Sequence, residues 1–257
     1  MNILLKSPEE IEKIRRTSRY VAEMLQQAKE FTKEGITTSD INSFLEEKIE
    51  QSPCTSAFKG YTGPYRDCSA FPASVCISVN DEIVHGIPGP RVLKAGDLVS
   101  LDFGLICDGY FSDHAISFVI GIPDFEIVSL LETTRSALYA GIDAMKAGNY
   151  IQDISAAIEE VLTSQKLGII RDYGGHGTGK KLHEPPSIPN WVHGDKGAKL
   201  RDGMVLALEP MATLGGDGWV LSDDGWTIKT KDGSLAAHFE HTIAIINGKP
   251  EILTIMV

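Results

Sequence analysis

The sequence has no long apolar run and no low-complexity segment. The apolar stretch Ile3–Leu5 is too short for the core of a signal peptide. No stretch approaches the roughly 18 apolar residues that a membrane-spanning helix needs. These absences predict a cytoplasmic protein without a membrane partner, and they leave no linker at which the chain would divide.

Positive charge is scarce: 24 Lys and Arg residues stand against 35 Asp and Glu residues, a formal net charge of −11. Because contacts to phosphate need Lys and Arg, this balance argues against a specific nucleic-acid partner. The 42% hydrophobic and 23% charged residues are close to globular averages, which argues against disorder, a collagen-like chain and a coiled coil. A chain of 257 residues can bury a large core, in one large domain or two small ones.

Cysteine is also rare, and the sequence holds no C-x-x-C pair. This argues against a zinc finger. No secretion signal accompanies the cysteines, so reduced thiols are the favoured state and a disulfide framework is the alternative. The four cysteines are Cys54, Cys68, Cys76 and Cys107.

Hydrophobic periodicity predicts both helices and strands. Ser7, Pro8 and Glu10 form a helix start with a capping box, and apolar residues at helical spacing follow as far as Ala28. Further helices are expected from about residue 38, over 124–147 and over 153–167. Strands are expected over Val75–Val79, Leu98–Phe103, Phe111–Ile120, Met204–Met211 and Phe239–Ile246, a loop over 59–73, and a loop or hairpin over 214–234.

A turn signal at Asp108-Gly109 predicts a hairpin between two of these strands. With that turn, Asp113 faces Gly104 and Asp102 faces Ala115, so the two aspartates lie diagonally on one face of the sheet. Two such carboxylates repel each other unless one holds its proton or a cation lies between them. For this pair alone, an exposed face with ordinary acids is the alternative.

Three further residues indicate a metal site. Glu209 ends the apolar run MVLAL and Glu240 enters another apolar run, where an unpaired carboxylate would be costly. His176 lies in GGHGTG, where glycine allows a ligand to approach closely. Two divalent cations would neutralise the four carboxylates, and the single nitrogen donor favours Co, Mn, Fe or Zn over Ca. The candidate ligands are Asp102, Asp113, His176, Glu209 and Glu240.

A faint internal repeat agrees with this grouping. Residues 95–102 read AGDLVSLD and residues 202–209 read DGMVLALE, so Asp102 and Glu209 stand at equivalent positions after a glycine. A duplicated α+β half would leave such a pattern and would deliver equivalent acids to one central site. One His-Gly pair precedes each segment, at His85-Gly86 and His176-Gly177.

Five segments together resemble type I methionine aminopeptidase. They are VCISVNDEIVHGIP (75–88), GDLVSLDFG…DGYFSDHAISF (96–118), GGHGTGKKLHEPP (174–186), GMVLALEPM (203–211) and HFEHTIAI (238–245). They span nearly the whole chain in the family's order, so the resemblance implies one catalytic domain over residues 1–257. It also implies the pita-bread α+β fold, in which two pseudo-symmetric halves share a central antiparallel sheet with flanking helices.

The resemblance implies roles for individual residues. The five candidate ligands match the family's metal ligands. His85 and His183 match its substrate-handling histidines, and Glu209 would also accept and return a proton. Two departures concern specificity: Leu182 stands where many members have an aromatic residue, and the loop 64–70 is longer than usual. The side chain of the substrate methionine would lie among Phe71, Cys76, Trp226 and Tyr61.

The implied reaction is hydrolytic removal of the N-terminal methionine from nascent proteins and peptides with a small second residue. Two divalent metal ions would serve as cofactor, and the resemblance further implies a monomer that associates transiently with the ribosome. A Pro-specific aminopeptidase P or prolidase on the same fold is the enzymatic alternative. A non-catalytic binding protein of this fold is the alternative from another class, and the complete ligand set argues against it.

Overall fold

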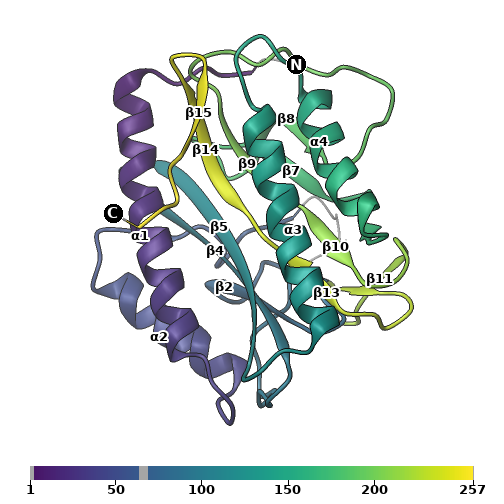
Figure 1. Cartoon of the computed structure of the whole chain (residues 1–257). Helices are drawn as coiled ribbons and strands as arrows, with labels where there is room; N and C mark the ends of the chain where they lie inside the picture. Colours follow the sequence, from purple (N-terminus) through teal and green to yellow (C-terminus); the bar gives the residue numbers. More distant parts are fainter. Residues whose placement is uncertain (1–2, 64–68, 257) are drawn as a thin grey trace.

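Helices pack against antiparallel sheets in the computed structural model, which describes residues 3–63 and 69–256 (Figure 1). The α+β architecture expected from the sequence is therefore confirmed. None of the helices in the described part combines the length and the apolar character that a bilayer crossing requires. The helices are α1 (Pro8–Phe31), α2 (Thr38–Glu50), α3 (Phe125–Ala144) and α4 (Ile151–Ser164).

The first helix, α1, begins with the predicted capping box. The Ser7 hydroxyl accepts the Glu10 backbone N–H at 3.2 Å, and the Glu10 carboxylate accepts the Ser7 N–H at 2.9 Å. Val21 and Leu25 on its apolar face are fully buried. Each such side chain contributes roughly 1.5–3 kcal/mol through burial, which holds α1 against the hairpin of the first sheet.

A four-stranded antiparallel sheet carries the two aspartates. Its β4–β5 hairpin turns at Asp108-Gly109, where both residues have positive φ. The register pairs Gly104 with Asp113 and Asp102 with Ala115, so the predicted diagonal placement is confirmed. The strands are β1 (Thr55–Ser56), β2 (Val75–Val79), β4 (Leu98–Cys107) and β5 (Tyr110–Val119).

A five-stranded antiparallel sheet contributes the remaining candidate ligands, in the strand order β15-β14-β9-β7-β8. The two sheets are joined where Ala115 of β5 and Glu240 exchange backbone hydrogen bonds of 3.0 and 3.4 Å. This junction places Glu240 directly beside the β4–β5 hairpin. The strands are β7 (Gly174–Gly177), β8 (Glu184–Pro189), β9 (Val205–Leu208), β14 (His241–Ile246) and β15 (Lys249–Ile252).

Two three-stranded sheets complete the described strands. The expected strand Met204–Met211 is split into β9 and β10, because Pro210 has no N–H to donate to a ladder. The split leaves Glu209 outside both strands. The short strands are β6 (Gly168–Ile169), β10 (Met211–Thr213) and β13 (Ala236–His238) in one sheet, and β3 (Glu82–Val84), β11 (Trp219–Leu221) and β12 (Ile228–Thr230) in the other.

Glycines at corresponding places in the two halves agree with the internal repeat. Gly96 (φ 92°) and Gly203 (φ 85°) both adopt the left-handed conformation two residues before β4 and β9. Gly35 (φ 89°) and Gly148 (φ 103°) do the same three residues before α2 and α4. Left-handed backbone strongly favours glycine. The two halves therefore use the same type of turn before the corresponding strands and helices.

The expectation of reduced thiols is wrong for one pair, since Cys54 and Cys107 form a disulfide. The strand β1 pairs with β4 so that Thr55 faces Ile106, which brings the next pair of Cα atoms to 4.5 Å. A two-residue strand leaves no periodic signal, so the sequence did not reveal this pairing. Cys76 is free and buried, whereas Cys68 lies outside the described residues.

Candidate metal centre

A cavity of about 530 Å³ brings together all the residues that the sequence singled out for the site. Strands of both large sheets contribute to its wall. The set consists of the five candidate ligands (Asp102, Asp113, His176, Glu209 and Glu240), two histidines (His85 and His183) and four residues of the expected methionine pocket (Tyr61, Phe71, Cys76 and Trp226).

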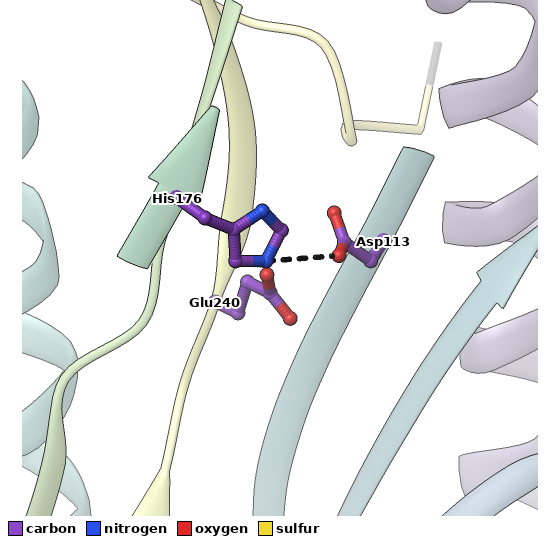
Figure 2. A group of neighbouring side chains, drawn as sticks. All are labelled: Asp113, His176 and Glu240. Carbon is purple, nitrogen blue, oxygen red and sulfur yellow. Dashed lines mark ion pairs between the residues drawn. The ribbon is translucent and has the colours of Figure 1, made fainter. Parts of the chain in front are cut away.

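Three ligand side chains converge from three different segments in Figure 2. Asp113 comes from β5, His176 from β7, and Glu240 from the connection between β13 and β14. One donor atom of each lies within 4.8 Å of the others. His176 Nε2 also lies 3.5 Å from Glu209 Oε1, the same distance as from Asp113 Oδ2. Four of the five candidate ligands therefore share one small volume.

The fifth candidate, Asp102, lies beside this group on β4. Its cross-strand partners are Ala115 of β5 and Cys76 of β2. Burial raises the pKa of both Asp102 and Glu209; the charge of Asp113 adds to the rise at Asp102, and the charge of Asp102 adds to the rise at Glu209. The hairpin register thus brings Asp102 into electrostatic contact with the other carboxylates.

The tautomer of His176 follows from its hydrogen bond. Its Nδ1 lies 2.9 Å from the backbone oxygen of Gly177. A carbonyl only accepts hydrogen bonds, so Nδ1 carries the proton and Nε2 presents a lone pair to the carboxylates. Burial lowers the pKa of His176 to about 4, which keeps the ring neutral at pH 7. A neutral imidazole binds metal ions through one ring nitrogen while a hydrogen bond from the other ring nitrogen fixes its orientation.

The carboxyl groups are held where negative charge is unfavourable. Burial, reinforced by the neighbouring carboxylates, raises the pKa of Asp102, Glu209 and Glu240 well above the ordinary range. Burial also raises the pKa of Asp113, to about 6, although Thr242 donates to its Oδ1 at 3.1 Å. Four such carboxyl groups around the lone pair of His176 Nε2 must either stay protonated or bind cations between them.

Two buried oxygen atoms support the second outcome. Asp102 Oδ1 and Glu240 Oε1 are inaccessible and have no hydrogen-bond partner among the described residues. An unpartnered buried carboxylate oxygen is costly, and a metal ion satisfies it. The donor set of four carboxylates and one neutral imidazole therefore fits divalent transition metals.

The two substrate-handling candidates, His85 and His183, line the same cavity as the candidate ligands. His183 lies edge-on to His176, with ring centroids 4.3 Å apart, and its Nδ1 lies 2.7 Å from the Tyr61 hydroxyl. His85 has a left-handed backbone (φ 61°) and lies edge-on to Trp226. Burial lowers the pKa of both histidines to about 4, so each is neutral at pH 7.

The expected methionine pocket forms an aromatic wall of the cavity. Phe71 and Trp226 make an edge-to-face pair with centroids 5.2 Å apart, and the indole N–H donates to the Ser69 oxygen at 2.9 Å. Leu182 is buried and lines the cavity as well. The loop 64–70, expected to influence specificity, falls largely outside the described residues, at positions 64–68.

The sequence missed several residues at this site. Phe58 and Tyr173 line the cavity, yet an aromatic residue in a loop carries no signal of its own. His238 lies with its Nε2 3.7 Å from Glu209 Oε2. His241, next to Glu240 in the sequence, bonds Thr254 at 2.8 Å and stacks on His114.

Comparison with known proteins gives one consistent family. The sequence pattern of metallopeptidase family M24 matches residues 12–247. The chain is 48% identical to the methionine aminopeptidase of Aquifex aeolicus over 259 aligned residues, covering 99% of each chain.

Solved structures agree with the sequence comparison. The crystal structure of a methionine aminopeptidase from Thermotoga maritima matches with a TM-score of 0.93 at 40% identity, over 98% of this chain and 99% of the other. The prolidase from Pyrococcus furiosus matches with a TM-score of 0.79 at 20% identity, over 98% of this chain and 66% of that one. The second match concerns the fold alone.

Proposed function

Since the chain belongs to metallopeptidase family M24, we propose that its five candidate ligands bind two divalent metal ions that serve one hydrolytic reaction. The full-length matches confirm the resemblance to type I methionine aminopeptidase, the pita-bread fold and methionine aminopeptidase activity. The proposal extends this activity to named residues. It rests on one observation: Asp113, His176, Glu209 and Glu240 converge in a cavity that also holds His183.

The charge balance supports two ions. Four carboxylates carry four negative charges, which two divalent ions neutralise, and Asp102 and Glu240 each offer an unpartnered oxygen. Co, Mn, Fe and Zn all accept this donor set, and availability decides among them. When bound, such ions activate water and polarise the carbonyl of the peptide.

The protein side chains then divide the remaining work. Glu209 is positioned to take a proton from water and return it to the leaving amine, because its carboxylate lies among the candidate ligands, with Oε1 3.5 Å from His176 Nε2. His183, neutral and bonded to Tyr61, would donate an N–H to the developing oxyanion. His85, which lines the same cavity, would contact the substrate near the scissile amide.

The substrate is a peptide with a free N-terminal methionine and a small second residue. Its thioether would lie against Phe71 and Trp226, where sulfur–aromatic contact is favourable, with Tyr61 and Cys76 completing the wall. The Pro-specific alternative has the fold in its favour, whereas the relatives with high identity are methionine aminopeptidases. The complete ligand set also argues against a non-catalytic binding protein.

We further propose that residues 1–257 act as one catalytic domain, because both sheets contribute ligands. Nascent chains with an intact initiator methionine arise in the cytoplasm, so we place the protein there, as a monomer with transient access to the ribosome. A disulfide is rare in that compartment. The redox state of Cys54 and Cys107 in intact cells therefore tests this localisation: reduced thiols would agree with the cytoplasm, and a disulfide would argue against it.

The test is a metal-reconstituted assay. The chelator-treated protein, loaded with Mn, Co, Fe or Zn, should bind two ions per chain and release methionine from Met-Ala-Ser faster than from Met-Leu-Ser. Asp113→Ala and His176→Ala should lower metal content and activity together, while Asp108→Ala, at the exposed turn of the same hairpin, should change neither. Full metal loading in His176→Ala, or preferred cleavage of an X-Pro peptide, would contradict the proposal.

A further inference from the structure

A buried ion pair joins the N-terminal segment to the turn that carries His183. Lys6 Nζ donates to Glu184 Oε2 at 2.5 Å, and the two side chains are 6% and 5% exposed. Among the described residues, every other pair of Lys or Arg with a carboxylate has at least one far more exposed member. A buried pair adds little net stability because both charges lose water. Its value therefore lies in what it holds in place.

Glu184 holds the turn closed. Its Oε1 accepts the backbone N–H of Lys180 at 2.7 Å and of Lys181 at 3.1 Å, while its Oε2 binds Lys6. Glu184 is the first residue of β8 and directly follows His183. The direction of the His183 side chain is thus fixed by a backbone segment that one carboxylate ties together.

Lys6 reaches this turn from an anchored backbone. Its N–H donates to the Gly203 oxygen at 2.7 Å, and a Cβ on Gly203 would lie 2.8 Å from the Lys6 oxygen. Its stem crosses Gly179, where a Cβ would lie only 2.3 Å from Lys6 Cε. Nζ also donates to the Leu4 oxygen at 3.1 Å. Lys6 therefore lies between the turn before β9 and the turn before β8.

We propose that Lys6 is a positioning residue for methionine removal, which acts on His183 through Glu184. This inference rests on the proposed role of His183 as oxyanion donor. The imidazole keeps contact with both Tyr61 and His176 only while the turn holds its shape. Without Lys6 the turn relaxes, and a misplacement of about 1 Å in a catalytic group costs about 100-fold in rate.

The first test compares steady-state kinetics of Mn-loaded variants on Met-Ala-Ser. In Lys6→Met, kcat should fall between about 10- and 100-fold, with KM within about twofold and metal content as in the wild type. Lys180→Met removes an exposed lysine from the same turn and should leave kcat within about twofold. A folded Lys6→Met variant with wild-type kcat would overturn the proposal.

The second test asks whether Lys6 acts through His183. In a His183→Ala background, Lys6→Met should lower kcat by no more than about twofold, because residues that act as a unit are not additive. A full additional loss in that background would overturn the proposal, as it would reveal a general structural effect. Release of methionine by the wild-type protein is measured separately. A failure of the proposed function is therefore distinguished from a failure of the proposed role of Lys6.

One control deals with folding. Lys6→Met leaves the buried Glu184 carboxylate without its cationic partner, which can prevent folding. In that case the double variant Lys6→Met, Glu184→Gln removes both charges while the amide oxygen still accepts the turn N–H groups. Its kcat should remain at least about tenfold below wild type because the tether to the N-terminal segment is gone. Wild-type kcat in the double variant would overturn the proposal.

Discussion

Replacement of Asp113 by Asn should stabilise the metal-free protein, although it removes a metal ligand. Burial raises the pKa of Asp113 from 3.8 to about 6. A carboxyl group whose pKa is higher in the folded chain favours folding at low pH, and that contribution is lost as the pH rises through the folded pKa. At pH 8 the buried carboxylate is therefore charged and unfavourable, and asparagine avoids this charge.

The magnitude follows from the two pKa values. Their difference corresponds to about 3 kcal/mol of unfolding free energy at pH 8 and roughly half of that at pH 5. The hydrogen bond from the Thr242 hydroxyl, 3.1 Å long in the wild type, survives because the asparagine oxygen accepts it equally. The variant also takes one negative charge away from Glu240, so its advantage is at least this large.

Urea unfolding of chelator-treated wild type and Asp113→Asn, followed by circular dichroism between pH 5 and pH 8, measures the difference. We expect the advantage of the variant to grow with pH. Saturating Mn²⁺ should reverse the order, since a bound ion stabilises only the protein that keeps its ligands. A stability difference that does not change with pH would refute the reasoning, because it would mean that Asp113 does not titrate as a buried acid.

Two further predictions concern the first sheet and the aromatic wall. Reduction of the Cys54–Cys107 disulfide should lower the unfolding free energy by about 4 kcal/mol, because it frees a loop closed over 53 residues. Urea unfolding with and without a phosphine reductant measures this, and a Cys54→Ser, Cys107→Ser control must be insensitive to reductant. Trp226→Ala should raise KM for Met-Ala-Ser about tenfold with metal content retained, since one wall of the thioether contact is lost. An unchanged KM would show that the methionine side chain binds elsewhere.

Local signals made the hairpin and its two aspartates predictable. Asp108-Gly109 fixes the turn, and the alternation of a strand then fixes which carboxylates share a face. The capping box at Ser7 and Glu10 is equally local and equally well predicted. In each case the residues that decide the structure are close together in the sequence.

Contacts between distant segments could not be read in this way. The Cys54–Cys107 bond, the approach of His238 to Glu209 and the Lys6–Glu184 pair depend on how the sheets pack. The ligand set was an exception. Acids at the ends of apolar strands indicate buried carboxylates that need a partner, even before any contact is known. Resemblance to a family supplied the roles of His85 and His183, which chemistry alone did not assign.

The backbone junction between Ala115 and Glu240 makes the site a property of the complete chain. No cut between Asp102 and Glu240 yields a fragment with all five ligands. Two complementary fragments would therefore have to associate and pair β5 with the Glu240 segment. Only the associated fragments would bind metal at full affinity. Metal uptake by split halves of this protein would thus report their association, in the manner of a complementation sensor.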